Sequence, residues 1–439
     1  MDRLTTIPGS TPLMNSQLDL FTLPATDVSV VSTSFNCIYP TYSIKQASAP
    51  IEFNLVGDNL HYIDLSKSFV YLRAKITLTD GEAVPAAKTV APVNLFLHSL
   101  WDSCELLING TLVSRSNSLY AYKAFIQKQL SNGDSAKKGL MTQEMYYKET
   151  KIGTWDATNL GFGDLCDLSR ASKSFEVLGK PVESLFQQSR LLPPNTDIRL
   201  RFRRNCDQFI LHGPELPATT ATFPYTLVLE EAAFFPHRVI VNPEIHASQS
   251  QRISKGENAL YPIRFADVKS FSIPSGSLNY VSESVFSGKL PELLIFCMVD
   301  SMGYAGTFHK NPFNFESFGL SSITVSVDNE PAIYRNLDID VDNSKYLLGY
   351  HTLFSAVSNP ILGNYITRAD YKAGNFFLVF DLQNSNLGNR FNPDRVGSIK
   401  LDIKFKTALT KSVHALVYGQ FQGVISIDGQ RNVHLDHTN

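Results

Sequence analysis

Every second residue is apolar in several segments of the chain. In FVYLRAKITLT (residues 69–79) the repeating apolar positions are Val70, Leu72, Ala74, Ile76 and Leu78. A period of two places these side chains on one face of a β-strand and the intervening residues on the other. The segment IRLRFR (198–203) alternates in the same way. The pattern predicts strands that each bury one face, as in a β-sandwich.

Turn and helix signals separate these strands. Asn109-Gly110 lies between CELLI and TLVS, and Asn-Gly accepts the positive φ angles of a tight hairpin turn. A rough apolar stripe predicts a short helix over 116–130, with Ser116 or Asn117 as its cap. A second Tyr-rich helical pattern spans 344–354.

The second half of the chain repeats the first half in order. Phe53 precedes Ser99 by 46 residues, and Phe271 precedes Ser317 by the same interval. Each serine is followed by an alternating strand with a turn, at Asn109-Gly110 or Asp328-Asn329, and then by one of the two short helices. The closing strands correspond as well, with 198–203 and 226–235 matching 399–405 and 415–427. The repetition predicts two sandwiches of about eight strands each.

We predict five segments from this organisation. They are an N-terminal arm (1–48), a first β-domain (49–236), a polar linker (237–256), a second β-domain (257–431) and a C-terminal tail (432–439). The arm has only five charged residues. It is predicted to be either an extended segment, which becomes ordered against a neighbouring molecule or against the chain's own surface, or a disordered tail. Segment 131–175 breaks the periodicity and is predicted to be a long loop, with Trp155 packing it down.

The charge balance adds little to this picture. The 439 residues include 39 Lys+Arg and 41 Asp+Glu, a net charge of −2, so no strong or sequence-specific nucleic-acid binding is predicted. The row Arg199, Arg201, Arg203 and Arg204 is a candidate phosphate site. Because the first three alternate on one strand face, we favour a solvated or acid-paired outer face.

No membrane segment or disulfide is predicted. No stretch approaches 18 consecutive apolar residues, and the N-terminus has no secretory signal. The odd number of cysteines, none in a CxxC pair, predicts free and mostly buried thiols in a reducing compartment. The five cysteines are Cys37, Cys104, Cys166, Cys206 and Cys297.

The chain lacks recognisable catalytic motifs. No phosphate-binding loop, nucleophile elbow or zinc-protease motif is present, and the ten histidines are scattered. Residues 338–343 resemble the start of a calcium loop, but Asn343 and Gly349 stand where such a loop needs Gly and Glu. We therefore expect an acidic turn there, with a bound cation as the alternative. The prediction is no enzyme, no cofactor, no metal and no catalytic, cofactor-binding or metal-binding residue.

Two long segments carry a family resemblance. The runs PIEFNLVGDNLHYIDLSKSFVYLRAKIT (50–77) and PVNLFLHSLWDSCELLINGTLVSRSNSLYAYKAFI (92–126) resemble capsid-type proteins of Polinton/Maverick elements and adintoviruses, copies of which are inserted in invertebrate genomes. The resemblance implies a double jelly-roll major capsid protein of the adenovirus–tectivirus lineage. The expected fold class is all-β, with two tandem jelly-roll β-sandwich domains and a few short helices in loops.

The resemblance also implies how the protein works. In that family, homotrimers form pseudo-hexameric units that tile an icosahedral virion capsid around double-stranded DNA, after assembly in the host cytoplasm or nucleus. The implied partners are other copies of the chain, forming trimers and trimer–trimer contacts, and penton and minor capsid proteins. The arm 1–48 and the segment 131–175 are the candidate contact regions. Two alternatives stay open: a minor or penton capsid protein, and a non-viral β-sandwich protein that binds or cleaves carbohydrate.

Overall fold

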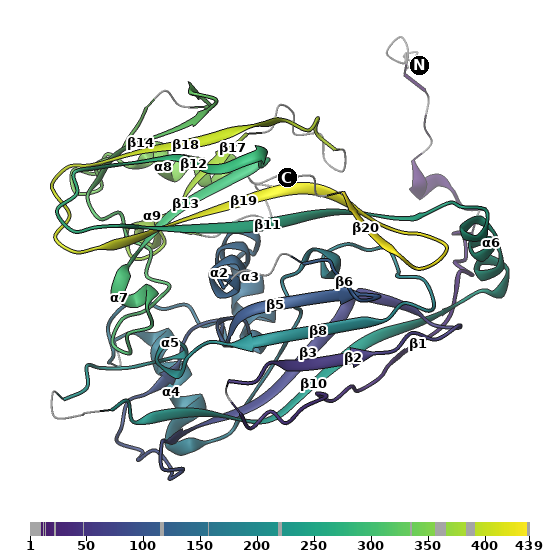
Figure 1. The fold of residues 1–439 in the computed structure, drawn as a ribbon, viewed down its shortest axis with the longest axis horizontal. Helices are drawn as coiled ribbons and strands as arrows, with labels where there is room; N and C mark the ends of the chain where they lie inside the picture. Colours follow the sequence, from purple (N-terminus) through teal and green to yellow (C-terminus); the bar gives the residue numbers. More distant parts are fainter. Residues whose placement is uncertain are drawn as a thin grey trace.

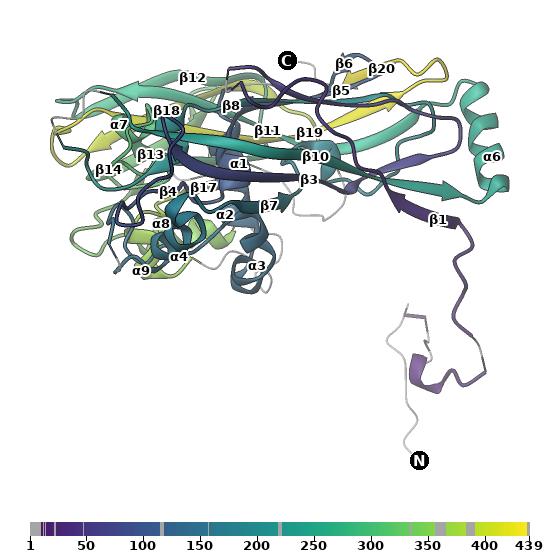
Figure 2. The ribbon, with the colours of Figure 1, turned by 90° about the horizontal axis from the view of Figure 1, so that it is seen from below.

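Two β-sandwiches lie side by side in the computed structural model (Figure 1). The structure describes residues 10–436, apart from 12, 14, 22, 47, 115–117, 157, 218–221, 334–335, 356–365 and 383–390. Long antiparallel strands run along the molecule, and most of the helices gather on one side of the sheets (Figure 2).

Eight strands form the first sandwich. They are β1 (Val30–Phe35), β2 (Ile51–Leu55), β3 (Tyr62–Leu78), β5 (Trp101–Ile108), β6 (Thr111–Leu112), β7 (Phe175–Gly179), β8 (Ile198–Arg204) and β10 (Tyr225–Val241). One sheet has the order β1-β10-β3-β7 and the other β2-β8-β5-β6. The short strands β4 (Ala91–Pro92) and β9 (Leu211–His212) pair separately.

The second sandwich repeats this plan. Its eight strands are β11 (Ala259–Ile273), β12 (Asn279–Lys289), β13 (Leu293–Asp300), β14 (Leu320–Val327), β15 (Glu330–Pro331), β17 (Leu378–Asp381), β18 (Val396–Phe405) and β19 (Val413–Ile427). The sheets have the orders β11-β19-β13-β17 and β12-β18-β14-β15, with β16 (Leu337–Asp338) and β20 (Val433–Asp436) added beside β14 and β19.

The strand order is the same in both domains. Counting the eight strands of each domain along the chain, one sheet is 1-8-3-6 and the other 2-7-4-5. Two four-stranded antiparallel sheets of eight strands in this order form a jelly roll. The predicted fold class, two tandem jelly rolls, is therefore confirmed.

The topology also tests the repeated features of the sequence. The turn-bearing fourth strands (β5 and β14), the seventh strands (β8 and β18) and the eighth strands (β10 and β19) correspond as predicted. The pairing of Phe53 with Phe271 was wrong, because Phe53 lies in the second strand of its domain and Phe271 in the first strand of its own. Equal spacing arose there without structural equivalence.

The two predicted turns have the expected backbone. Asn109 and Gly110 have φ angles of 49° and 82°, and Asp328 and Asn329 have 52° and 69°. Positive φ at both central residues is the requirement of the hairpin turn whose twist matches that of the strands. Asn, Asp and Gly tolerate this conformation, which explains why these residue types occupy both sites.

The helices are short and lie in the connections. They are α1 (Phe96–Ser99), α2 (Tyr120–Ser131), α3 (Asp134–Lys138), α4 (Leu160–Ser169), α5 (Asp207–Ile210), α6 (Pro243–Ser254), α7 (Ser301–Tyr304), α8 (Leu347–Ser355) and α9 (Arg368–Lys372). The 3₁₀ helices are η1 (Ser16–Leu18), η2 (Leu140–Glu144), η3 (Arg170–Ser172) and η4 (Ser184–Phe186). Helices α2 and α8 confirm the two helical patterns; the proposed caps Ser116 and Asn117 lie outside the described residues.

Several segment boundaries differ from the sequence prediction. Strand β1 lies inside the predicted arm 1–48, and β20 lies inside the predicted tail 432–439. The predicted linker 237–256 contains the end of β10 and helix α6, in which Pro243 occupies the first turn and Asn242 accepts a cap bond. The predicted loop 131–175 contains α3, η2, α4 and η3, and Trp155 packs on Phe162 as expected.

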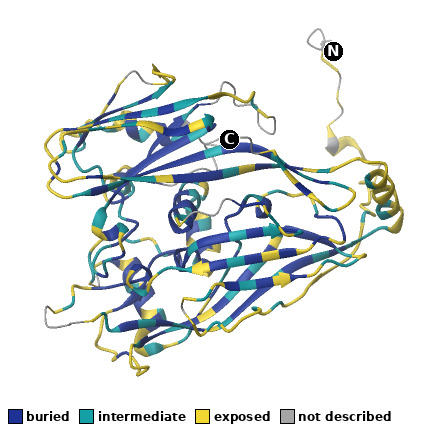
Figure 3. Cartoon of the chain, in the orientation of Figure 1, coloured by how far each residue is buried: buried dark blue, intermediate teal, exposed yellow. Residues whose placement is uncertain are grey.

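Buried and exposed side chains alternate along the strands (Figure 3). In β3, Val70, Leu72, Ala74 and Ile76 are buried, and the three residues between them are more exposed. Trp101 of β5 stacks on Phe202 of β8, with ring centroids 4.7 Å apart. The alternation of apolar and polar residues in the sequence therefore matches the alternation of buried and exposed side chains in the strands.

Candidate assembly surface

The arginine row on β8 faces acids of the same chain. Arg201 contacts Glu52 at 3.1 Å and Glu105 at 3.2 Å, from the neighbouring strands β2 and β5. Arg203 contacts Asp102 at 2.7 Å, and Arg199 lies 3.4 Å from Glu52. Arg204 is paired with Asp207. These guanidinium groups are engaged by carboxylates across the sheet, which supports the acid-paired outer face over a phosphate site.

The calcium-like segment 338–343 forms a lysine-paired turn. Asp340 accepts hydrogen bonds from Asn343 and lies 3.0 Å from the Lys406 ammonium, while Lys345 lies 3.8 Å from Asp338. Both aspartates are therefore paired with lysines of the same chain. Within the described ranges, no three His, Cys, Asp or Glu side chains gather to hold a metal ion.

The cysteines lie at both buried and exposed positions. All five cysteines are free, with Cys104, Cys166 and Cys297 buried and Cys37 and Cys206 exposed. Among the residues that the structure describes, no helix has the length and apolar character needed to span a membrane.

Aromatic side chains join the two jelly rolls. Phe125 of α2 stacks on Phe313 of the second domain, with ring centroids 4.3 Å apart and planes 5° from parallel. Tyr122 of the same helix stacks on Tyr304 at 5.6 Å and meets Phe313 edge-on at 5.4 Å. Helix α2 belongs to the first domain and lies between the two sandwiches (Figure 1). It therefore forms the centre of the seam between them.

Polar side chains extend this seam beside α2. Gln129 donates to Asn375 at 2.8 Å, and the Lys148 ammonium lies 2.7 Å from Asp370. Asn311 donates to Glu149 at 2.9 Å, and burial raises the pKa of this carboxyl group. These residues of the first domain lie on α2 or in segment 131–175. The segment predicted as a contact region therefore contacts the second domain of its own chain.

A cavity of about 410 Å³ remains in this part of the seam. Phe125, Phe313, Lys137, Glu149 and Asp370 are among its lining residues. The Lys137 ammonium donates to the Gln129 carbonyl at 2.9 Å, and burial lowers its pKa to about 8. Lysine is a compact point charge whose pKa falls readily when it is buried. Lys137, Glu149 and Asp370 are therefore each paired with another residue of this chain.

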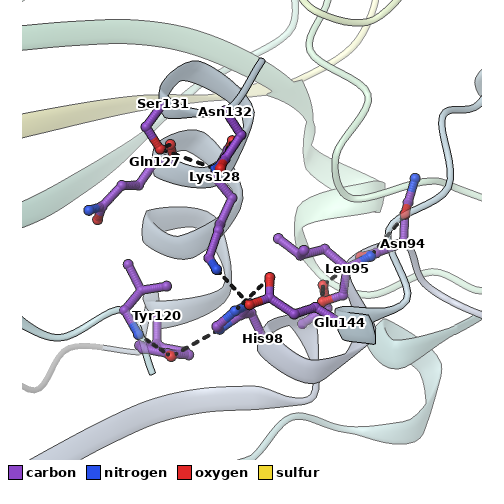
Figure 4. Close-up of polar contacts among 11 residues, drawn as sticks. Asn94, Leu95, His98, Tyr120, Gln127, Lys128, Ser131, Asn132 and Glu144 are labelled. Atoms are coloured by element: carbon purple, nitrogen blue, oxygen red, sulfur yellow. Dashed lines mark hydrogen bonds and ion pairs between the residues drawn. The ribbon is translucent and has the colours of Figure 1, made fainter. Parts of the chain in front are cut away.

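A buried polar network holds α2 on the first jelly roll (Figure 4). The Lys128 ammonium lies 2.6 Å from one Glu144 oxygen, and His98 Nε2 lies 3.4 Å from the other. Tyr120 Oη lies 3.1 Å from His98 Nδ1 and accepts from the Val182 amide. Burial lowers the pKa of His98, so we assign a neutral ring whose Nδ1 accepts from Tyr120 and whose Nε2 carries the proton beside Glu144.

Glu144 is ionised in this network. Burial alone would raise its pKa, but His98 and Lys128 outweigh burial and hold the pKa at about 2. Nearby donors and opposite charges favour the carboxylate in this way. A second, fully buried pair lies on the same helix, where the Lys123 ammonium contacts both Glu183 oxygens at 3.1 Å. These charges fix the position of α2 and of the aromatic rings that it presents to the second domain.

Sequence reasoning did not identify these seam residues. Lys123 lies among apolar residues in YAYKAFI, which is a signal for a buried and paired lysine. Glu144 and Glu183 have no comparable signal, because Glu144 ends the short 3₁₀ helix η2 and Glu183 lies in the connection between β7 and η4.

Exposed apolar side chains are concentrated in the N-terminal arm. The part of the arm that precedes β1 leaves the two domains and extends away from them (Figure 2). Phe21 and Leu23 are more than 90% exposed, and Leu18 and Leu20 are more than 60% exposed. A cluster of exposed apolar residues of this kind is typical of a segment that contacts another molecule.

The fold and the seam define a double jelly-roll protein, and the comparisons with known proteins agree. A chain in the Sputnik virophage structure has a TM-score of 0.69 and 12% identity, covering 98% of this chain and 94% of that one. The mavirus major capsid protein (TM-score 0.57, 11% identity, 99% and 96% covered) and the faustovirus major capsid protein (0.57, 8%, 95% and 92%) share the architecture.

At the level of sequence, the chain is 26% identical to an uncharacterized protein of Caenorhabditis elegans over 421 residues. The similar region covers 89% of this chain and 94% of the nematode protein. No family model matches the chain.

Proposed function

We propose that this protein is a major capsid protein that assembles as pseudo-hexameric homotrimers into an icosahedral shell around double-stranded DNA. The observation that carries the proposal is the pair of jelly rolls with identical strand order, fixed side by side by the α2 seam. Three such chains place six similar domains around one axis, which gives a nearly sixfold outline from threefold symmetry.

The comparisons support a coat role. Two of the solved structures with the same architecture over nearly the whole chain are major capsid proteins, from mavirus and faustovirus. We place this chain with the Polinton/Maverick and adintovirus type because of the resemblance over 50–77 and 92–126. A nematode protein of the same extent fits this assignment, since copies of such genes occur in invertebrate genomes.

The surface chemistry suits a shell that encloses DNA without binding it tightly. The net charge is −2, and the arginine row of β8 is engaged by acids of the same sheet. We propose the virion capsid as the location of the protein, with assembly in the host cytoplasm or nucleus. Its proposed partners are further copies of the chain and penton and minor capsid proteins.

The alternatives receive less support. A penton or minor capsid protein usually has one jelly roll, whereas this chain has two. A glycosidase needs two carboxylates set on either side of a sugar bond. The buried carboxylates described above are committed to lysine, histidine or amide partners within the fold. We therefore propose that the protein is not an enzyme.

Light scattering on the purified chain tests the proposal. Each chain has a mass of 48.9 kDa, so a trimer has a mass of about 147 kDa, and larger closed shells are visible by negative-stain microscopy. A stable monomer or a pentamer contradicts the proposed trimeric coat.

A further inference from the structure

A pocket of about 440 Å³ lies where helix α6 meets the first strand of the second domain. Tyr62 at the start of β3 and Arg190 in the connection before β8 line it from the first domain. Arg252 near the end of α6 and Tyr261 near the start of β11 complete its walls. Its volume falls in the range of about 300–1,000 Å³ that is typical of small-molecule sites. We call it the α6 pocket.

Hydrogen bonds between the two domains hold two of these side chains in place. Arg190 Nη1 donates to the Leu260 carbonyl at 2.6 Å, and Tyr261 Oη donates to the Leu191 carbonyl at 3.0 Å. A guanidinium group has five N–H donors, and a neutral carbonyl leaves its positive charge unbalanced. Within the part of the chain that the structure describes, Arg190 forms no ion pair with a carboxylate.

A second arginine, Arg431, lies beside the two tyrosines. It belongs to the hairpin between β19 and β20, which runs next to α6 (Figure 1, Figure 2). Asn109 Nδ2 ties this hairpin to the first domain by donating to the Arg431 carbonyl at 2.7 Å. Burial raises the pKa of Tyr62 and of Tyr261, and the charge of Arg431 opposes the rise at both. The guanidinium group is therefore close enough to act on both rings.

The guanidinium group of Arg431 has a buried nitrogen without a partner. Among the described residues, nothing forms a hydrogen bond with its Nη1. Burial lowers the pKa of Arg431, and the groups that oppose this are Tyr261 and Tyr62 rather than a carboxylate. A buried polar atom left unsatisfied in a native protein calls for a water molecule or an ion that completes its hydrogen bonds.

Two acids in this region are engaged by other groups. Glu257 lines the pocket and pairs with Arg252 at 2.6 Å. Asp428, in the hairpin, accepts from the backbone amide of Asn432 and lies 3.2 Å from a ring nitrogen of His434. The last carbonyl groups of α6 accept from the backbone amides that follow them. These acids therefore do not neutralise the two arginines described above.

We propose that the α6 pocket binds a phosphate group, with Arg190 and Arg431 as its cationic partners. The two arginines reach it from different domains, and a phosphate offers oxygens to donors that arrive from several directions. A planar carboxylate is matched by a single guanidinium fork and would use one of the two. The phosphate belongs either to a free phosphate ligand or to a nucleic-acid backbone, which present the same chemical group. The site lies within one chain and does not depend on the proposed function.

Phosphorus NMR of inorganic phosphate, titrated with the purified chain in chloride buffer at constant ionic strength, tests the proposal. We expect line broadening that saturates. Arg431→Gln should weaken the affinity at least about tenfold, because it removes a charge-assisted hydrogen bond. We expect this variant to keep the circular dichroism of wild type, since the buried nitrogen that it removes has no partner in the described chain. Arg190→Gln is a second variant that should also weaken the affinity.

Arg170→Gln is the matched control. It removes one positive charge at an exposed position that does not line the pocket. Because salt screens distant charges, we expect its affinity to stay within about twofold of wild type. A wild-type chain without saturable broadening, an Arg431→Gln chain that binds phosphate as tightly as wild type, or an equal loss in the control overturns the proposal.

A fluorescent single-stranded oligothymidylate distinguishes the two sources of the phosphate. An anisotropy increase that inorganic phosphate competes away and that Arg431→Gln abolishes assigns the site to a nucleic-acid backbone. Saturable binding of inorganic phosphate without binding of the oligonucleotide assigns it to a free phosphate ligand. A monomeric wild-type chain that binds phosphate contradicts the proposed function and supports this site.

Discussion

The buried Lys123–Glu183 pair supports a specific prediction about stability. Both side chains are less than 10% exposed, and the ammonium contacts both carboxylate oxygens at 3.1 Å. Lys123→Met leaves the carboxylate buried without its partner, which costs about 3–5 kcal/mol in the free energy of unfolding. The double replacement, Lys123→Met with Glu183→Leu, leaves no buried unpaired charge. We therefore expect its free energy of unfolding to lie within about 1 kcal/mol of that of wild type.

Denaturant unfolding followed by tryptophan fluorescence measures this difference. Both tryptophans, Trp101 and Trp155, lie in the first jelly roll, as does the charged pair. The double variant must be more stable than the Lys123→Met variant by roughly 2 kcal/mol or more. If the two variants unfold at the same denaturant concentration, the pair does not interact as the structure indicates.

The pH dependence of the Lys123→Met variant provides an independent check. Burial raises the pKa of Glu183, and Lys123 opposes this rise. Without Lys123, the folded-state pKa rises further above the unfolded value. A carboxyl group with a raised folded pKa stabilises the fold at low pH and loses that contribution as the pH rises through the folded pKa. The defect of Lys123→Met is therefore expected to be smaller near about pH 5 than near about pH 7.5.

Three further predictions concern other parts of the chain. Glu144→Gln removes the carboxylate whose pKa His98 and Lys128 hold at about 2. The stabilising contribution of this carboxylate is present above its unfolded pKa and is lost as the pH falls toward its folded pKa, so the thermal-stability deficit of the variant at about pH 7 should shrink toward about pH 3. Phe125→Ala removes the ring that stacks on Phe313 and should cost about 3–5 kcal/mol in denaturant unfolding, with earlier proteolysis between the domains. Gly213→Ala places a Cβ 2.5 Å from a backbone oxygen, so we expect a lower melting temperature by calorimetry.

The strands were predictable because their burial follows a simple rule. In β3 and β8 one face is buried and the other is half-exposed or solvated, so the sequence alternates with the same period. Strand β1 does not obey this rule, since all six of its residues are exposed. The alternation signal was therefore absent, and the strand was assigned to the arm.

Helix α6 was not predicted for a different reason. None of its residues is buried, so it has no apolar stripe for sequence reasoning to detect. Its start is fixed instead by the cap at Asn242 and by Pro243, a local signal within a segment that otherwise has the composition of a polar linker.

The seam between the two domains could not be predicted for a third reason. Phe125 and Phe313 are far apart in the sequence, and their stacking depends on how the two domains pack.

The internal duplication has an energetic consequence for the proposed assembly. Each association step between separate molecules costs several kcal/mol in lost translational and rotational freedom. Because the α2 seam joins two jelly rolls within one chain, three of the six domain contacts in a ring are already made before any copies meet. Covalent linkage also lets the two kinds of contact diverge. The contact within the chain can be aromatic and permanently buried, as Phe125 and Phe313 are. In the proposed assembly the contact between chains can be weaker, so that a misplaced copy can dissociate before the ring closes.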